Sequence, residues 1–596
     1  MLKRILALTL CLLTVALSLA SCYGSIPMDA EDKGHIINAY VAGDMYSFDP
    51  GKDITDESAV KFYGLIYEGL FRLDEKGNVK NALAENVKII ENDANKEYKM
   101  QIRIKETKWS NGQALTADDF VFAWKRLMEP TYQSTAAALL YDVKNARTVK
   151  AGDASIDDLG VVALDTYLLE ISFETKIDYE NFKKNLASVA LVPLREDVVA
   201  TNQRNWARKH STLVTNGPFA IKNIDRDENT LRLERNIYYY RDTEEDMLDR
   251  YVKPYRINVS FIKEGDKPSG QKAAADDLDA IYAAYQNGDV LYMDDIPLSK
   301  RSSLKKDAHV TNANSTYSYL FNTENKILSD ARVRKALSIS VDRKKIADIL
   351  VYADPATGLI ANTVFNDTKG KTYREVHGGV ISTSADLNGA KNLLAEAGVT
   401  SGTLTLKFRA NDAETKVAEY VAGEWEKLGF TVKLIPLTAT TEKIVNKQTE
   451  EEEVFYYDSV QEAYETGDFD ILAVDISMYG TDPFAALSVY ATKFSGNGIN
   501  MADRSYEFIP HVTGFSNPEY DAIIEKAFNE KKISKRSDIL YTAEKMLMNE
   551  APVMPLVFNK DYYISKDLKD IKTSYLGYRD FNNLQYPGYK YVPEEK

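Results

Sequence analysis

Cysteine is almost absent from this chain of 596 residues. Its two cysteines are Cys11 and Cys22, both close to the amino terminus. Beyond residue 22 the sequence therefore offers no disulfide, no thiolate nucleophile and no cysteine metal site. A chain of this length can bury a core large enough to fold outside the cytoplasm without disulfides.

Common catalytic and nucleotide-binding signatures are also missing. The sequence has no Gly-x-x-x-x-Gly-Lys-Ser/Thr loop, no Gly-x-Ser-x-Gly elbow and no His-Glu-x-x-His motif. Its five histidines are isolated from one another, and its 89 acidic residues form carboxylate pairs by chance. We therefore predict that the protein is not an enzyme and that it has no cofactor and no metal site.

Long apolar runs are absent except at the amino terminus. Lys3 and Arg4 precede an apolar stretch from Ile5 to Leu19, and Ala20-Ser21-Cys22 follows it. This pattern predicts a lipoprotein signal peptide over residues 1–21, cleaved before Cys22, whose thiol then carries a lipid. The alternative is an ordinary secretory signal with a chance cysteine. No other stretch approaches the ~20 apolar residues that a membrane span needs.

Basic residues are fewer than acidic residues in this sequence. Lysine and arginine total 74 against 89 acidic residues, for a net charge of −15. Without Lys3 and Arg4 the balance is 72 minus 89, or −17. An acidic surface repels nucleic-acid phosphates and anionic lipid head groups, so we predict no nucleic-acid partner.

Strand and helix patterns alternate along the rest of the chain. Apolar residues alternate with charged ones over residues 98–105, which predicts a half-buried strand. Residues 331–350 and 416–428 read as amphipathic helices, and residues 521–548 read as a helical region with a break near Ser534. This order predicts a mixed α/β protein, and the length predicts two or three domains or lobes.

One segment carries a distinctive motif. Asn111-Gly112 predicts a turn, Thr116 is a natural helix N-cap, and Asp119 can bond back to the amide of Thr116. The segment Lys108-Trp109-Ser110-Asn111-Gly112 and the following helix resemble the signature of family 5 extracellular solute-binding proteins. Further pieces resemble this family in the same order, namely Phe48-Asp49-Pro50, Ile66-Tyr67-Glu68-Gly69-Leu70, Trp124-Lys125-Arg126, Thr215-Asn216-Gly217-Pro218-Phe219, Tyr319-Leu320-Phe321-Asn322-Thr323 and Gly467-Asp468-Phe469-Asp470.

The resemblance implies an α/β fold of the periplasmic-binding-protein type, in the large peptide-binding subclass, with two lobes that close on a ligand. Carried over, residues 22–35 are a lipidated tether, residues 86–212 an extra subdomain of the first lobe, and residues 313–545 the second lobe. The first lobe then comprises residues 36–85, 213–312 and 546–596. The chain would cross between the lobes near residues 312 and 545, which makes a hinge.

The family's ligand anchor is altered in this sequence. Peptide-binding relatives hold the ligand's amino terminus with an aspartate four residues before a proline, near a tryptophan. Counting back from Pro483 gives Tyr479, and Ile476 stands at the tryptophan position. The resemblance therefore implies that Tyr479 contacts the ligand. Asp475 or Asp482 could replace the missing carboxylate, with the loop that holds Asp53 and Asp56 on the other side of the ligand. Turn capping and exposure to solvent are the alternative roles for these acids.

The resemblance implies a lipid-anchored, extracytoplasmic receptor that captures peptides and delivers them to the permease and ATPase subunits of an ABC importer. It would act as a monomer, held by its lipid to the outer face or the periplasmic side of the cell membrane. Because the anchor is altered, a related receptor that binds a non-peptide solute is an alternative. A third alternative is a receptor-like lipoprotein without a transport role.

Overall fold

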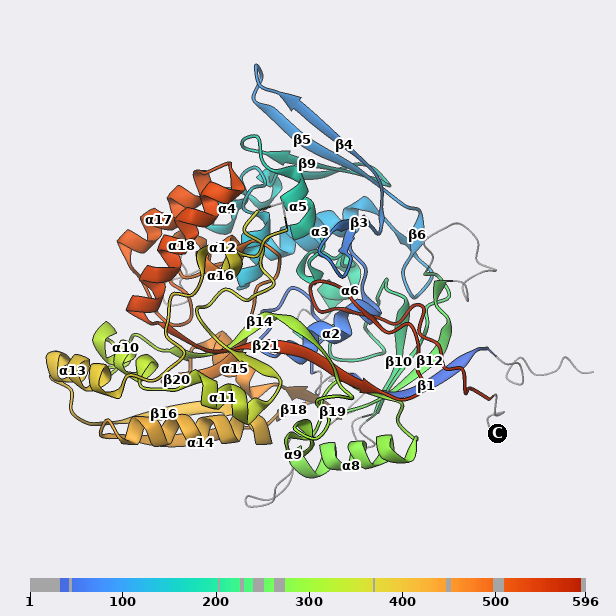
Figure 1. The fold of residues 1–596 in the computed structure, drawn as a ribbon. Helices are drawn as coiled ribbons and strands as arrows, with labels where there is room; N and C mark the ends of the chain where they lie inside the picture. Colours follow the sequence, from blue (N-terminus) through green and yellow to red (C-terminus); the bar gives the residue numbers. More distant parts are fainter. Residues whose placement is uncertain are drawn as a thin grey trace, which may run out of the picture.

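A mixed sheet of eleven strands forms the framework of the protein (Figure 1). The computed structural model describes residues 33–41, 46–201, 204–225, 230–239, 251–261, 274–367, 370–445, 452–496 and 509–590. In spatial order the sheet runs β10 (Phe219–Asp225), β11 (Thr230–Arg235), β12 (Pro254–Ser260), β1 (His35–Tyr40), β13 (Tyr292–Met293), β21 (Val553–Ser565), β14 (His309–Phe321), β20 (Ile471–Ser477), β16 (Gly402–Arg409) and β17 (Phe430–Leu437), with β15 (Ala353–Pro355) paired to β21.

Two long strands join the halves of this sheet. β14 and β21 have 13 residues each and pair antiparallel, with register shifts between Asn312 and Thr316 and between Tyr317 and Ser318. At its carboxyl end β21 pairs with β13, and the second half of β14 pairs with β20. The predicted crossing at residue 312 therefore lies within β14. Residue 545 lies in α18 (Ile533–Glu550), just before β21. The division into lobes stays a prediction.

A separate sheet of four strands lies within the predicted extra subdomain. Its order is β4 (Ala84–Asn92), β5 (Glu97–Ile104), β9 (Leu168–Phe173) and β8 (Val161–Asp165), all antiparallel. α3 (Ala117–Met128) packs on β8 and β9, and it buries Phe120 and Trp124. The indole of Trp124 donates a hydrogen bond to the Leu191 carbonyl at 2.9 Å. The strand predicted over residues 98–105 is thus β5.

Helices and short strand pairs complete the chain. The remaining strand pairs are β2 (Phe71–Leu73) with β3 (Val79–Asn81), β6 (Thr107–Lys108) with β7 (Ala114–Leu115), β18 (Thr440–Val445) with β19 (Glu452–Tyr457), and β22 (Lys572–Thr573) with β23 (Arg579–Asp580). The other helices are α2 (Glu57–Ile66), α4 (Ala146–Lys150), α5 (Tyr179–Asn185), α6 (Glu196–Thr201), α8 (Ala274–Asn287), α9 (Leu298–Arg301), α10 (Ala331–Ile339), α11 (Arg343–Leu350), α12 (Tyr373–His377), α13 (Leu387–Ala397), α14 (Asp412–Glu426), α15 (Ser459–Thr466), α16 (Pro483–Ser488) and α17 (Pro518–Asn529).

Local signals in the sequence explain most helix boundaries. The capping box of Thr116 and Asp119 is confirmed, with the Thr116 amide donating to Asp119 at 2.8 Å. The single helix predicted over residues 331–350 is wrong, because α10 ends at Ile339 and α11 begins after Asp342. Asp342 accepts hydrogen bonds from the Lys344 and Lys345 amides, which starts a new helix.

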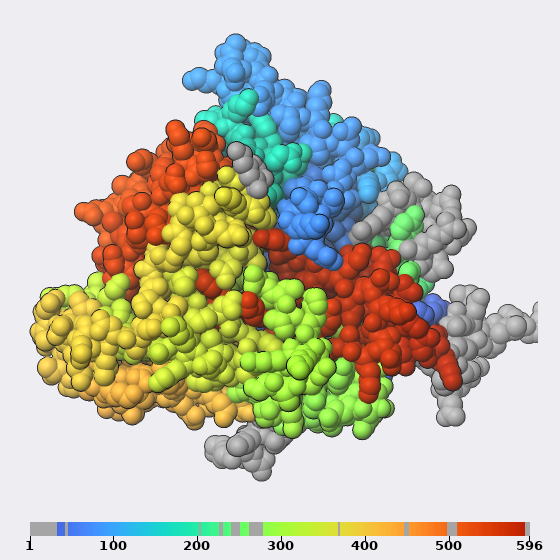
Figure 2. All heavy atoms as spheres, viewed as in Figure 1, coloured from blue at the N-terminus to red at the C-terminus, as the bar shows by residue number. Residues whose placement is uncertain are grey.

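Segments from opposite ends of the chain lie together on one face of the molecule. In Figure 2, residues near the amino terminus, in blue, lie beside residues near the carboxyl terminus, in red. Arg72 pairs there with Asp580 at 3.4 Å, and α2 packs on β23. Within the described ranges, no helix combines the length and the apolar character that a bilayer crossing needs.

Candidate functional site

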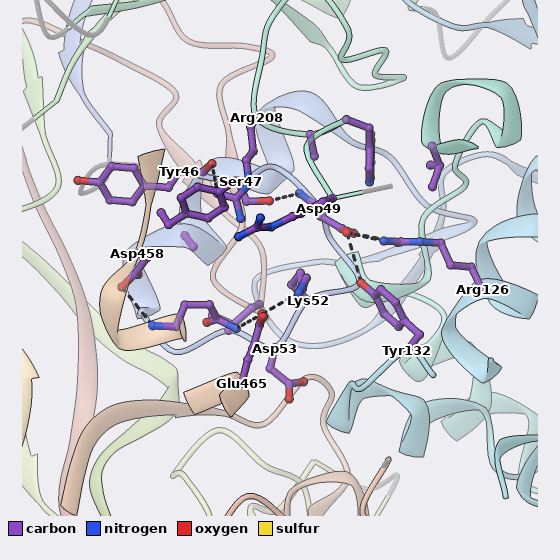
Figure 3. Close-up of a pocket in the computed structure, with 18 of the residues that line it drawn as sticks. Tyr46, Ser47, Asp49, Lys52, Asp53, Arg126, Tyr132, Arg208, Asp458 and Glu465 are labelled. Carbon is purple, nitrogen blue, oxygen red and sulfur yellow. Dashed lines mark hydrogen bonds and ion pairs between the residues drawn. The ribbon is translucent and has the colours of Figure 1, made fainter. Parts of the chain in front are cut away.

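A cavity of about 770 Å³ opens where three parts of the chain meet. The loop before α2 and the first turns of that helix form one wall, and the second wall comes from α3 and the residues just beyond it. The cavity is closed by segments 196–200 and 204–208 and by the region from Tyr457 to Glu465. We call it the large cavity; Figure 3 shows its labelled side chains. Its volume lies within the range of small-molecule binding pockets.

A buried ion pair fixes the first wall. Arg126 of α3 donates to both carboxylate oxygens of Asp49, at 3.0 and 2.5 Å, and only 13% and 5% of these two side chains are exposed. The hydroxyl of Tyr132 lies 3.4 Å from the same carboxylate (Figure 3). Burial alone would raise the pKa of Asp49, but the charge and hydrogen bonds of Arg126 hold it below its usual value. The pair therefore ties the loop to α3.

Side chains of the first wall also reach α15 across the cavity. Lys52 pairs with Glu465 at 2.8 Å, and the Thr55 hydroxyl donates to Gln461 at 2.7 Å. Near these contacts, Arg409 donates to both oxygens of Asp458 at 2.9 and 2.8 Å and lies 3.6 Å from Asp56. The Lys52 and Thr55 contacts join residues more than 400 positions apart in the chain. Together with the approach of Arg409 to Asp56, they link segments that the sequence places in different lobes.

The segment from Asp53 to Glu57 contacts the end of β20 directly. The Asp475 amide donates to the Thr55 carbonyl at 3.1 Å. The Asp475 carboxylate accepts hydrogen bonds from the Glu57 amide at 2.8 Å and from the Asn559 side chain at 2.7 Å. Both of its oxygens are thus engaged within the protein. Burial, and then the nearby charge of Asp56, raise the pKa of Asp475 to about 6.

Tyr479, in the turn after β20, also contacts the segment from Asp53 to Glu57. Its hydroxyl donates to Asp53 at 3.1 Å and accepts a hydrogen bond from the Ile54 amide at 2.9 Å. Asp53 also accepts from the amide and hydroxyl of Thr135, at 2.8 and 2.7 Å. Tyr479 has φ +54°, a left-handed backbone that is uncommon for a tyrosine. Backbone strain of this kind concentrates at functional sites.

Replacing Tyr479 by phenylalanine should loosen this contact. The variant keeps the ring but leaves the Ile54 amide without its partner and removes one of the hydrogen bonds to Asp53 Oδ1, which costs about 1–2 kcal/mol. We expect the free energy of unfolding to fall by that amount and the Asp53 loop to exchange its amide hydrogens faster. Hydrogen exchange measured by mass spectrometry checks this. Equal protection of residues 53–57 in both proteins would contradict the assignment.

A smaller cavity of about 250 Å³ lies on the other side of the Asp53–Glu57 segment. Asp56 lines both cavities. The small cavity is rich in carboxylates, and they include Glu57, Asp294, Glu414 and Asp475. Burial is the largest cause that raises the pKa of Glu57 to about 8 and that of Glu414 to about 7. At neutral pH the fold therefore favours the uncharged form of Glu57.

Glu57 should make the protein less stable at alkaline pH. Its pKa in the folded state is about 8, above its usual value of 4.5. Its stabilising contribution is therefore fully present below pH ~4.5 and is lost as the pH rises through about 8. Glu57→Gln imitates the uncharged acid, so it should be more stable than the wild type at pH 9 by about 1–3 kcal/mol.

Thermal unfolding of Glu57→Gln at several pH values checks this dependence. The gain over the wild type should shrink between pH 9 and pH 5. Glu75 is exposed, so Glu75→Gln is the matched control and should show no such trend. A difference between Glu57→Gln and the wild type that stays constant from pH 5 to pH 9 would contradict the prediction.

The structure brings four of the five predicted ligand-binding residues together. Asp53, Asp56, Asp475 and Tyr479 lie within one network between the cavities. Asp482 lines neither cavity: it accepts from the Phe484 amide at 2.8 Å, where it caps α16, and it pairs with Arg536. Whether these residues bind a ligand stays a prediction. The predicted lipidation site, Cys22, lies outside the described residues.

Other residues of the large cavity were not singled out from the sequence. Asp49 and Arg126 lie within motifs that carry the family resemblance, but nothing local assigns them to one ion pair. Arg208 and Glu465 lie in segments without any motif, as does Arg409 of the small cavity. In the ranges that the structure describes, no group of three or more histidine, cysteine or acidic residues is placed to hold a metal ion.

Two curated proteins are similar to this chain over most of its length. The dipeptide-binding protein DppE of Bacillus subtilis is 26% identical over 86% of this chain and 85% of its own length. The probable deoxycholate-binding periplasmic protein YgiS of Escherichia coli is 28% identical, over 86% of each chain.

The fold also matches a solved structure, the substrate-binding domain of an oligopeptide ABC transporter from Bacillus anthracis. The two share a TM-score of 0.73 at 24% identity, over 93% of this chain and 99% of that one. This confirms the predicted two-lobed α/β fold. The model of the bacterial extracellular solute-binding proteins, family 5 (Middle), matches residues 78–498. Since that match covers most of the sequence, the chain belongs to the bacterial extracellular solute-binding proteins of family 5.

Proposed function

We propose that this protein captures peptides between its two lobes and delivers them to the permease of an ABC importer. The observation that carries the proposal is the large cavity, whose walls come from both predicted lobes and from the extra subdomain. A ligand that contacts both lobes stabilises the closed form over the open one, and its differential affinity sets the shift. The name of the relative DppE, which spans most of the chain, supports peptides as the ligand class.

The proposal includes attachment to the membrane through a lipid on Cys22. The apolar stretch before it and the small residues Ala20 and Ser21 support cleavage at that position. Residues 22–35, the predicted tether, would then link the membrane to the receptor. The receptor would stay close to its permease while the lobes open and close.

A second candidate ligand class is a non-peptide solute. Tyr479 stands where the family resemblance places an aspartate, so an ammonium group would lose one charge-assisted hydrogen bond, about 1.5–3 kcal/mol. The relative YgiS, named as a probable deoxycholate-binding protein, supports this alternative. Each oxygen of the Asp475 carboxylate already accepts one hydrogen bond within the protein, which favours the alternative over Asp475 as a replacement for that aspartate.

Ligand identification tests the proposal. Protein purified from its own host is analysed by native mass spectrometry, and protein refolded without ligand is titrated with peptide pools of two to six residues by calorimetry. We expect a co-purified peptide and saturable binding of one peptide per chain. A co-purified compound that is not a peptide, together with no heat from any pool, would favour the second candidate.

A further inference from the structure

Arg208 differs from the other basic residues of the large cavity. Among the described residues, five basic side chains line it, and four of them pair with a carboxylate. The pairs are Lys52 with Glu465, Lys125 with Asp157, Arg126 with Asp49 and Arg204 with Glu442, all at 3.0 Å or less. Arg208 has no carboxylate within ion-pair distance among the residues that the structure describes.

Two backbone carbonyls and an aromatic ring hold Arg208 in place. Its Nη1 donates to the Tyr46 carbonyl at 3.0 Å and to the Tyr456 carbonyl at 2.9 Å. The guanidinium lies 4.2 Å from the centre of the Tyr457 ring. Tyr46 lies close to Arg208 in Figure 3, at one side of the cavity. These contacts fix the position and plane of the guanidinium before any ligand arrives.

One edge of this guanidinium has no partner. Its Nε is buried and has no hydrogen-bond acceptor in the described part of the chain, and its Nη2 donates to none of the described residues. Nη2 carries two N–H groups that carboxylate oxygens can accept, whereas the buried Nε is closed to a ligand in the cavity. Burial lowers the pKa of Arg208, and nearby Tyr457 and Glu465 only partly oppose this effect. A bound carboxylate would supply the missing counter-charge.

We propose that the Nη2 group of Arg208 binds a carboxylate of the ligand in the large cavity. The inference rests on the proposed function, and it narrows the ligand class to peptides with a free carboxylate at this end. The carboxylate has two possible sources, namely the carboxyl terminus of the peptide and an acidic side chain. Arg208 then acts as a specificity residue, since a ligand without the carboxylate leaves its donors unsatisfied.

Matched peptides test the inference on the wild-type protein. A peptide that binds in calorimetry is compared with its carboxyl-terminal amide and with the variant in which each Glu is replaced by Gln. We expect one of the two changes to weaken binding about 10- to 100-fold, and the affected peptide identifies the source of the carboxylate. If peptides bind but neither change weakens binding, the inference is wrong while the proposed function stands. If no peptide binds at all, both fail.

Two substitutions then assign the effect to Arg208. Arg208→Gln should remove the preference for the free carboxylate. Arg208→Lys should keep only part of it, because a lysine ammonium cannot keep both carbonyl contacts and still present an N–H group to the ligand from the same position. Arg103 is exposed and pairs with Asp165, so Arg103→Gln removes one positive charge outside the cavity and should keep the full preference. If Arg208→Lys folds, as its thermal midpoint reports, yet discriminates as well as the wild type, the assignment to Arg208 is wrong.

Discussion

Arg126→Ala should destabilise the protein by about 3–5 kcal/mol and weaken ligand binding about 10-fold. The substitution leaves the Asp49 carboxylate, of which 5% is exposed, buried without its counter-ion. Removing one partner of a buried pair is costly because the remaining charge stays desolvated. Without Arg126, Asp49 would no longer tie the loop that carries Asp53 and Asp56 to α3. This wall of the large cavity would therefore lose its fixed position.

Chemical denaturation and calorimetry with a bound peptide measure the two effects of Arg126→Ala. The double variant Asp49→Asn/Arg126→Met is the matched control, since it removes both charges and should recover at least half of the lost stability. A loss below about 1 kcal/mol for Arg126→Ala would mean that this ion pair does not hold the loop.

Cys22→Ala should release the protein from the membrane almost completely. Two or more acyl chains give stable attachment, at ~0.8 kcal/mol for each buried CH₂ group, and the variant cannot receive them. No helix in the described ranges offers a membrane span in their place. In cells that express the variant, we expect the chain in the medium or periplasm, whereas the wild type sediments with membranes.

Cys11 provides a matched control for this substitution. It is the other cysteine of the chain and lies inside the predicted signal peptide, so Cys11→Ala should leave attachment unchanged. Metabolic labelling with a radioactive fatty acid should mark the wild type and Cys11→Ala but not Cys22→Ala. A Cys22→Ala protein that still sediments with membranes would show that something other than this lipid anchors it.

Short-range features of the fold could be predicted from the sequence because their causes are local. The capping box at Thr116 and Asp119 depends on residues three positions apart, and the strand over residues 98–105 shows its own alternation. The break between α10 and α11 was also local, since Asp342 is a strong N-cap residue, but the apolar pattern across it obscured the boundary. Motifs in a fixed order were enough to identify the family.

The large cavity could not be predicted in the same way. Arg208 is fixed by the Tyr456 carbonyl, and 248 positions separate the two residues. Such a contact depends on how the segments pack, and no sequence pattern around Arg208 predicts it. The sequence did place Asp53, Asp56, Asp475 and Tyr479 near one another, through the family resemblance. It could not show that Asp475 and Tyr479 already use their polar atoms to contact the Asp53 loop.

Closure of the lobes around a peptide is the central claim, and a distance measurement tests it most directly. Asp157 and Asp468 lie near the cavity in the extra subdomain and the second lobe, and their side chains are 81% and 83% exposed. With no cysteine beyond residue 22, a soluble chain that begins at residue 23 and carries Asp157→Cys and Asp468→Cys can be spin-labelled at these two sites alone. We predict that a saturating peptide replaces a broad distance distribution with a shorter, narrower one. A distribution that stays the same when the peptide is bound would contradict the account.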